Sequence, residues 1–166
     1  MRKPNIAILG ATGVVGREIT KITDELGVEF NSIKFLSSAK SAGTKLTFQG
    51  KEYTLEEAKP ESFDGIDIVM ASAGGSTSQK FAPEIVKRGG LIIDNSSAFR
   101  MDKDVPLVIA GVNDEDLRLH KGIIANPNCS TSQLMLALEP LNKKFGIILL
   151  HLPFLSYLWF LPAFRH

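Results

Sequence analysis

The sequence of 166 residues contains a single cysteine, Cys129, so the chain cannot form an internal disulfide. It also lacks an excess of either charge, because 19 Lys and Arg side chains oppose 18 Asp and Glu side chains for a net charge of +1. A balanced chain has no basic field of the kind that attracts nucleic acid. The first residues show no signal-peptide pattern. We therefore expect a cytoplasmic protein without nucleic-acid or membrane partners.

No uninterrupted apolar run is long enough to cross a membrane. The most apolar segment, residues 147–166, carries Arg165 as its only full charge, but Pro153 and Pro162 interrupt it. A membrane span needs about 18–20 consecutive apolar residues, so this segment does not qualify. Its composition nevertheless differs from everything before it. We therefore divide the chain into one domain over residues 1–147 and an atypical apolar tail over residues 148–166.

The domain has the composition of a globular protein with a core, since 44% of the whole chain is hydrophobic and 22% is charged. Short apolar runs alternate with segments of helical spacing, which predicts an α/β fold with a Rossmann-like, doubly wound, mostly parallel sheet and helices on both faces. The expected strands are 5–9, 32–36, 66–71, 91–93, 107–109 and 123–125, with a hairpin over 46–48 and 52–55. The expected helices are 14–26, 79–88 and 130–145, the last carrying Leu134, Leu138 and Leu141 on one face.

A glycine-rich loop separates the first predicted strand from the first predicted helix. Gly10, Gly13 and Gly16 have the spacing G-x-x-G-x-x-G within the segment Gly10-Ala11-Thr12-Gly13-Val14-Val15-Gly16. Glycines at such a corner let a pyrophosphate approach the helix N-terminus, where N–H groups and the helix dipole favour anions. The loop therefore predicts a dinucleotide site. The alternative is that the glycines serve only a tight turn.

The sequence lacks an acidic residue where a domain selective for NAD places one. That acid usually lies about 20 residues after the glycines, at the end of the second strand. Here no Asp or Glu occurs between Glu29 and Glu52, and the segment 37–44 offers hydroxyl groups and a cation instead, at Ser38, Lys40 and Ser41. These groups suit a 2′-phosphate, so we predict NADP as the cofactor. A solvated surface loop is the alternative interpretation.

The single cysteine lies at a second strand-to-helix corner, in Asn126-Pro127-Asn128-Cys129-Ser130-Thr131. Pro127 ends the strand, and Asn128 is a good N-cap, which puts Cys129 in the first helical turn. The positive end of a helix dipole favours a thiolate there. We therefore predict a nucleophilic cysteine, although a lone cysteine is often an inert, buried side chain. We assign no metal site.

Taken together, these motifs resemble aspartate-semialdehyde dehydrogenase over about residues 5–147, the nucleotide-binding half of that family. Besides the glycine-rich loop and the cysteine motif, the resemblance rests on Ser38-Ala39-Lys40-Ser41-Ala42-Gly43, Ser72-Ala73-Gly74-Gly75-Ser76-Thr77-Ser78, Asp94-Asn95-Ser96-Ser97-Ala98-Phe99-Arg100, Val105-Pro106-Leu107-Val108 and Gly111-Val112-Asn113. N-acetyl-glutamyl-phosphate reductase also opens with a glycine-rich loop. It tends to carry a Pro-Gly-Cys-Tyr type of motif, which this chain lacks.

The resemblance implies an enzyme that converts aspartate semialdehyde, phosphate and NADP to aspartyl phosphate and NADPH, and that runs in reverse in the biosynthesis of lysine, threonine and methionine. It implies that Cys129 is the nucleophile, that Asn128 binds substrate and the developing oxyanion, and that Arg100 binds phosphate. On sequence alone, the alternative interpretation of Arg100 is a surface arginine that follows a strand. The implied cofactor residues are Gly10, Thr12, Gly13, Val14, Val15, Gly16, Ser38, Lys40, Ser41, Ser72, Gly74, Ser76 and Thr77.

The resemblance stops after about residue 147. The family continues into a second domain that supplies the acid/base histidine, the substrate-carboxylate arginine and most of the contacts of a homodimer or homotetramer. Residues 148–166 do not match the sequence of this second domain. Residues 161–166 can, however, be encoded by codons that give a sequence near a family motif when the reading frame is shifted by one base. We therefore interpret residues 148–166 as out-of-frame translation. Two functions remain open: a semialdehyde dehydrogenase, inactive or nearly so in this form, and an NADP-binding module without turnover.

Overall fold

The computed structural model describes residues 2–147, so the predictions for residues 148–166 lie outside the described part. Its main feature is a six-stranded, fully parallel sheet with the strand order β5-β2-β1-β6-β7-β8. The strands of this sheet are β1 (Asn5–Leu9), β2 (Ser32–Ser37), β5 (Glu56–Glu57), β6 (Ile68–Ala71), β7 (Leu91–Asp94) and β8 (Ile123–Ala125). The remaining elements are α1 (Val14–Glu25), the antiparallel hairpin β3 (Lys45–Phe48) and β4 (Lys51–Thr54), α2 (Gly75–Lys87), α3 (Cys129–Phe145) and two 3-10 helices, Pro60–Phe63 and Asp114–Leu119.

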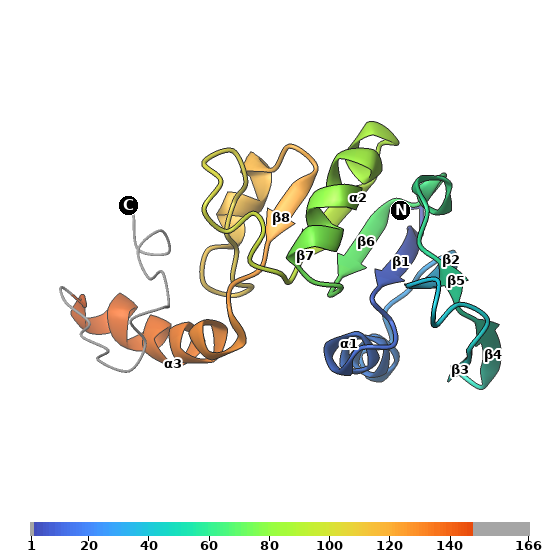
Figure 1. The fold of residues 1–166 in the computed structure, drawn as a ribbon. Helices are drawn as coiled ribbons and strands as arrows, with labels where there is room; N and C mark the ends of the chain where they lie inside the picture. The colour runs from blue at the N-terminus through green and yellow to red at the C-terminus, as the bar shows by residue number, and fades with distance from the viewer. Residues whose placement is uncertain (1, 148–166) are drawn as a thin grey trace.

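The sheet is doubly wound. Helix α1 connects β1 to β2 in one direction along the sheet, and α2 connects β6 to β7 in the opposite direction. Right-handed crossovers therefore put the two helices on opposite faces, and Figure 1 shows them on either side of the central strands. The predicted fold class is confirmed. The strand order reverses between β1 and β6, the point at which ligands bind in open α/β sheets.

The core has one layer on each face of the sheet, and β1 contributes to both. Ala7 and Leu9 point to a cluster that contains Phe63 and Phe81 beneath α2. Ile6 and Ile8, with alternate positions on the strand, belong to a second cluster on the other face. In that second cluster the ring of Phe35 packs edge-on against the rings of Phe48 and Tyr53, with centroids 5.5 and 5.2 Å away. The hairpin therefore covers the apolar surface that β2 would otherwise expose.

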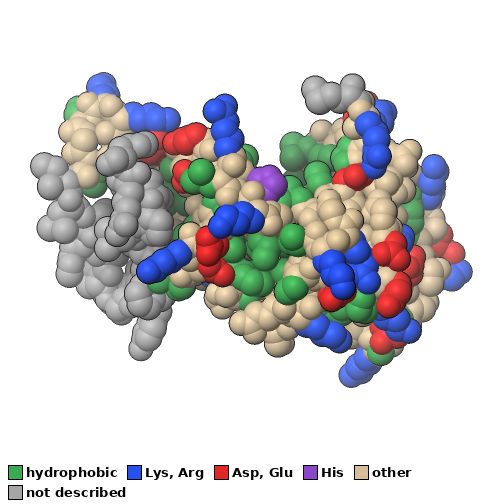
Figure 2. Space-filling model, turned by 90° about the horizontal axis from the view of Figure 1, so that it is seen from above, with side chains coloured by type: hydrophobic (Ala, Val, Ile, Leu, Met, Phe, Trp, Pro, Cys, Tyr) green, Lys and Arg blue, Asp and Glu red, His purple; other side chains and the backbone are tan. Residues whose placement is uncertain are grey.

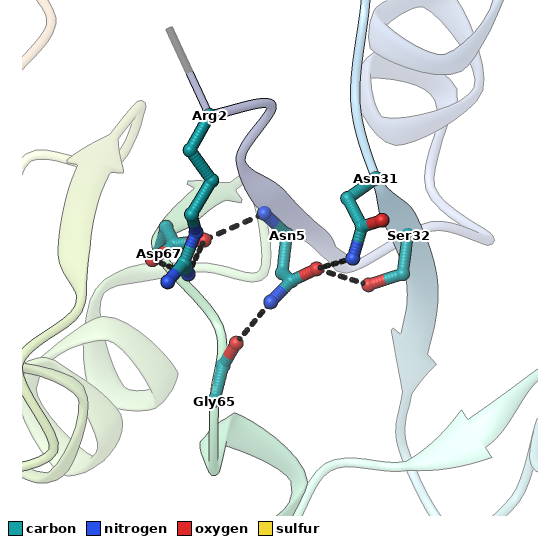
Figure 3. Close-up of polar contacts among 6 residues, drawn as sticks. All are labelled: Arg2, Asn5, Asn31, Ser32, Gly65 and Asp67. Carbon is teal, nitrogen blue, oxygen red and sulfur yellow. Dashed lines mark hydrogen bonds and ion pairs between the residues drawn. The ribbon is translucent and has the colours of Figure 1, made fainter.

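Asn5 ties the amino-terminal edge of the sheet together (Figure 3). Its backbone N–H donates to Asp67, and its side-chain oxygen accepts from Asn31 and Ser32. Arg2 forms an ion pair with Asp67 at 2.8 Å. The hydrogen bonds from Asn5 and Arg2 lower the pKa of the Asp67 carboxyl below its ordinary value. This network joins β1, β2 and β6 at the edge opposite the one where α1 and α2 begin.

Three predicted elements differ in the structure. Helix α2 begins at Gly75 and not at Gln79, so Ser76 and Thr77 lie in its first turn and not in a loop before it. Residues 107–109 form no strand, only an isolated bridge between Leu107 and Ala125. The reason is local: the Asn113 side chain accepts from the Ile109 N–H and donates to the Leu107 carbonyl, and so holds these residues in a loop.

The third difference is the buried face of α3. Thr131, Met135 and Glu139 form its buried stripe, whereas the expected Leu141 is 49% exposed. Leu134 and Leu138 are half-buried beside that stripe. Helix α3 extends away from the sheet (Figure 1). Strand β5, which pairs with the end of β2, was not expected from the sequence.

The surface drawn in Figure 2 carries Lys and Arg side chains interspersed with Asp and Glu side chains, as the balanced composition predicts. Within residues 2–147, no helix is both long enough and apolar enough to cross a membrane.

Candidate functional site

The carboxyl ends of β1 and β6 carry two glycine-containing corners that pack on each other. Gly10 has a φ of +90°, and a Cβ added there would clash with the Ser72 carbonyl. Gly16 is equally constrained, because a Cβ there would clash with the Gly10 carbonyl. Both positions require glycine for reasons internal to the protein. The tight-turn interpretation therefore accounts for Gly10 and Gly16.

Gly13 has no such requirement. Its φ of −68° is open to any residue, and an added Cβ would make only an ordinary contact, 3.4 Å from the Gly10 carbonyl oxygen. It is the N-cap of α1 and provides no side-chain hydrogen bond to the helix. The N–H groups of the first turn are thus left for an external acceptor. Val14 is 84% exposed beside them, while Thr12 is half-buried and Val15 is exposed.

Helix α2 begins in a similar way at the neighbouring strand. Its N-cap, Gly74, has a φ of +86° and offers no side-chain cap. Ser72, which lies under Gly10, precedes it; Ser76 is exposed and Thr77 is half-buried in the first turn. Two uncapped helix N-termini therefore flank the point where the strand order reverses. This arrangement fits the pyrophosphate of a dinucleotide, since both ends attract anions.

The loop after β2 begins beside the glycine-rich loop. The Leu36 carbonyl accepts hydrogen bonds from the N–H groups of Gly10 and Ala11, at 2.9 and 3.2 Å. Beyond it, Ser38 and Lys40 are exposed and Ser41 is half-buried. Among residues 2–147, Lys40 has no ion-pair partner. The structure therefore places the predicted 2′-phosphate residues on a loop adjoining the proposed nucleotide site.

Strand β5 brings an acidic residue to the same strand end, which the sequence did not reveal. Glu57 lies opposite Ser37 in the parallel register, and Lys59 forms an ion pair with it at 3.0 Å. The acidic residue that selects NAD is sought about 20 residues after the glycines, at the end of the second strand. Glu57 does not have this spacing because it belongs to β5 and not to β2. Its carboxylate already has a cation as its partner.

Cys129 is the first residue of α3 and is exposed. The Asn128 side chain caps this helix, as predicted: its Oδ1 accepts from the Ser130 N–H at 3.0 Å and from the Ser130 hydroxyl at 2.8 Å. The thiol lies 3.6 Å from the same Oδ1. Within residues 2–147 the Asn128 Nδ2 has no hydrogen-bond partner, so this amide can donate to an external oxygen next to the thiol.

Arg100 reaches from the loop after β7 to the strand end that precedes Cys129. Its Nε donates to the Asn126 carbonyl at 2.9 Å and its Nη2 to the Asn95 carbonyl at 3.0 Å. Burial lowers the pKa of the guanidinium, and the charges of Asp94 and Cys129 oppose that shift. A guanidinium stays protonated under all ordinary conditions. Arg100 is therefore a fixed cation near the thiol rather than a mobile surface side chain.

Asp94 is a buried polar residue that was not among the predicted site residues. Asp94, the last residue of β7, is completely buried and accepts hydrogen bonds from the Ser78 and Ser96 hydroxyls at 2.5 and 2.6 Å. The sequence shows Asp94 within a motif, but Ser78 is sixteen positions away and only the fold brings the two side chains together.

Among residues 2–147, no group of three or more His, Cys, Asp or Glu side chains is arranged to hold a metal ion.

The chain has clear relatives among known proteins. Aspartate-semialdehyde dehydrogenase of Bacillus subtilis is 54% identical over 143 residues, which cover 86% of this chain and 41% of that protein. The chain thus spans about two fifths of the length of this relative. Aspartate semialdehyde dehydrogenase II from Vibrio cholerae, complexed with ASA, matches with a TM-score of 0.85 at 38% identity, over 88% of this chain and 49% of the other.

A second solved structure matches at greater distance. Aspartate semialdehyde dehydrogenase with NADP from Candida albicans has a TM-score of 0.70 at 27% identity, covering 87% of this chain and 48% of the other. The family model described as semialdehyde dehydrogenase, NAD binding domain, matches residues 5–120. The resemblance inferred from the motifs is confirmed. The chain belongs to the aspartate-semialdehyde dehydrogenase family and carries its nucleotide-binding domain.

Proposed function

We propose that this chain contributes the nucleotide site and the nucleophile of an NADP-dependent, phosphorylating dehydrogenase of L-aspartate 4-semialdehyde. The overall reaction converts the aldehyde, phosphate and NADP to aspartyl phosphate and NADPH, and biosynthesis of lysine, threonine and methionine uses the reverse direction. The observation that carries the proposal is the exposed Cys129 at a capped helix N-terminus, with Asn128 beside it and Arg100 fixed nearby.

Cys129 is proposed to attack the aldehyde carbon through Sγ and to form the covalent bond to substrate. Asn128 can keep Oδ1 on the helix cap and still donate from Nδ2 to the oxygen that develops negative charge. Arg100 uses Nε and one Nη to hold its position, which leaves the rest of its planar fork for a phosphate oxygen. Each side chain therefore has a separate task in the proposed chemistry.

The proposed nucleotide site lies across the corners of β1 and β6. NADP, when bound, supplies the hydride acceptor. Its pyrophosphate is proposed to lie over Gly13 and the first turn of α1, with Val14 against the ligand, and near the first turn of α2. The full proposed set is Gly10, Thr12, Gly13, Val14, Val15, Gly16, Ser72, Gly74, Ser76 and Thr77.

Selectivity for NADP over NAD is proposed to come from Ser38, Lys40 and Ser41. Lys40 is the exposed cation of the loop, and its charge would attract a 2′-phosphate. Glu57, at the same strand end, has Lys59 as its ion-pair partner. The local field therefore favours the phosphorylated ribose.

We further propose that residues 1–147 form one nucleotide-binding domain. The partners are the small-molecule substrates and further copies of the protein in a homodimer or homotetramer. A free, exposed cysteine is typical of a reducing compartment, so the proposed location is the cytoplasm.

The test is reduction of NADP by the purified chain, measured with aspartate semialdehyde and phosphate supplied together and singly. Turnover that needs both compounds, is lost in Cys129→Ser and is weaker with NAD supports the proposal. Saturable NADP binding without turnover identifies the chain as a binding module. Turnover with N-acetyl-glutamate semialdehyde in place of aspartate semialdehyde would assign it to the reductase family instead.

A further inference from the structure

Asp94 is a fully buried carboxylate at the carboxyl edge of the sheet that the proposed chemistry leaves without a task. It lies between Ala71 at the end of β6 and Ala125 at the end of β8 in the parallel register. Its hydrogen-bond donors are uncharged, and no described cation forms an ion pair with it. Burying a carboxylate is costly, and such a group is often found where function requires it.

The two oxygens of Asp94 serve two different segments. Oδ1 accepts from the Ser78 hydroxyl of α2, and thereby from the helix whose first turn belongs to the proposed nucleotide site. Oδ2 accepts from the Ser96 hydroxyl, and Oδ1 also accepts from the Ser96 N–H at 3.2 Å. The Ser96 hydroxyl in turn accepts from the Ala98 N–H at 3.1 Å. Asp94 thus determines the course of the loop over residues 95–100.

Arg100 is the last residue of that loop. Its Nη2 donates to the carbonyl of Asn95, the residue directly after Asp94, and its Nε donates to the Asn126 carbonyl near Cys129. The Asn126 N–H in turn donates to the Asp94 carbonyl at 2.8 Å. Moving the Asp94 side chain would therefore shift the loop from which Arg100 extends, while β7 and β8 stay paired.

We propose that Asp94 is a positioning residue for Arg100. Through Ser96 and the loop over residues 95–100 it holds the Arg100 guanidinium near the Cys129 thiol. Through Ser78 it fixes the same loop to α2. The anion-binding task of Arg100 rests on the proposed function, but the placement of Arg100 by Asp94 does not.

The single cysteine provides a direct readout of the position of Arg100. Iodoacetate is an anion and iodoacetamide is neutral, and both alkylate the thiolate of Cys129. The ratio of their rate constants therefore reports the local positive charge, and the intrinsic reactivity of the thiol cancels. A nearby guanidinium raises this ratio, and one unit charge about 6 Å away in nearly water-like surroundings changes it about threefold. The measurement needs neither NADP nor turnover.

The variants are Arg100→Gln, Asp94→Asn and, as a matched control, Asp102→Asn, which removes an exposed acid next to the same loop. We expect Arg100→Gln to lower the ratio about threefold. Asp94→Asn should lower it by a similar factor, although it removes a negative charge. The double variant should fall no further than Arg100→Gln alone. Asp102→Asn should leave the ratio unchanged or raise it slightly.

The direction of the change separates the explanations. If Asp94 acted only through its charge, Asp94→Asn would raise the ratio, and if it only stabilised the fold, the ratio would stay constant while the melting temperature fell. Either result overturns the proposal, as does an unchanged ratio in Arg100→Gln.

A second variant, Ser96→Ala, is used if circular dichroism shows that Asp94→Asn does not fold. It keeps the Asp94 carboxylate, and a ratio of rate constants at the wild-type value would overturn the proposal. Absence of saturable NADP binding by the unmodified chain would contradict the proposed function and leave this result unaffected.

Discussion

The Arg100 guanidinium donates from Nε to the backbone carbonyl of Asn126, at 2.9 Å, and this bond joins the loop after β7 to the strand end that leads into Cys129. The two segments come from neighbouring strands of the sheet. Their junction places a permanent cation near the only thiol in the chain. The proposed acyl-transfer chemistry needs this combination of nucleophile and anion-binding group.

Asn128 combines a structural and a chemical task, which two substitutions can separate. Asn128→Asp keeps the oxygen that caps α3 but replaces the Nδ2 donor with a carboxylate oxygen. We expect its free energy of unfolding to match that of the wild type, while alkylation of Cys129 by iodoacetamide slows, because a second negative charge disfavours the thiolate. Asn128→Ala should instead lower the free energy of unfolding by about 1 kcal/mol through loss of the cap. Equal stability in both variants would contradict the assignment of the cap.

Cys129 itself should react with iodoacetamide at about pH 6 faster than a small model thiol does, because it is exposed in the first turn of α3, next to the positive end of the helix dipole. The matched control is the same chain unfolded in urea, in which the helix is lost. A folded chain that reacts no faster than the unfolded one would show that the corner does not activate the thiol.

Lys40 should govern the choice between NADP and NAD. Lys40→Asp places a carboxylate where the 2′-phosphate is proposed to lie, so we expect NADP affinity to fall at least about tenfold, or about 1.4 kcal/mol, with little change for NAD. Calorimetric titration of both nucleotides measures this difference. Lys103→Asp, which makes the same charge change in the loop after Arg100, serves as the control. A parallel loss of both affinities would exclude the loop as the source of selectivity.

Because of Asp67, we expect part of the free energy of unfolding to be lost at acidic pH. Its pKa in the folded chain is lowered by the hydrogen bonds from Asn5 and Arg2, so it contributes stability above its unfolded pKa, and this contribution is lost as the pH falls through the folded pKa. Asp67→Asn should therefore make the free energy of unfolding less dependent on pH between about pH 5 and 2. Urea titrations across that range would show it, and unchanged slopes would contradict it.

The parts of the fold that could be predicted are those encoded locally. The apolar run Asn5–Leu9, the glycines after it and the Asn128 cap depend on neighbours within a few positions, and the structure has each of them in place. The pairing of β5 with β2 and the bond from Ser78 to Asp94 could not be predicted, because both join residues that only the folded sheet brings together.

Two further differences between the predicted and observed elements concern residues 107–109 and the start of α2. The apolar run at residues 107–109 has the composition of a strand, but Asn113 occupies the Leu107 carbonyl and the Ile109 N–H. Of these three residues only Val108 donates its N–H to β8, at the Ala125 carbonyl, and no strand forms. At α2, the sequence predicted a helix that begins at residue 79, whereas Gly74 takes a positive φ and the helix begins at Gly75. In both cases the cause is a neighbour within six residues that strand and helix spacing does not reveal.

Gly13 and Gly16 provide the most direct test of whether the corners at the carboxyl ends of β1 and β6 bind a dinucleotide. Gly16→Ala places a Cβ against the Gly10 carbonyl and should destabilise the folded chain outright. Gly13→Ala meets no clash inside the protein and, as an N-cap change, should cost no more than about 1 kcal/mol of stability. Its methyl group would lie 3.4 Å from the Gly10 carbonyl oxygen and 4.0 Å from the Ser72 carbonyl oxygen, at the corner where the pyrophosphate is proposed to lie.

The deciding measurement is calorimetric titration of NADP into the wild-type chain and into Gly13→Ala, with the fold of each verified by circular dichroism. If these corners bind the dinucleotide, we expect saturable binding to the wild type with one site per chain, and binding at least about tenfold weaker in a folded Gly13→Ala variant. Equal NADP affinity in the two folded proteins, or no saturable binding by the folded wild type, would contradict it.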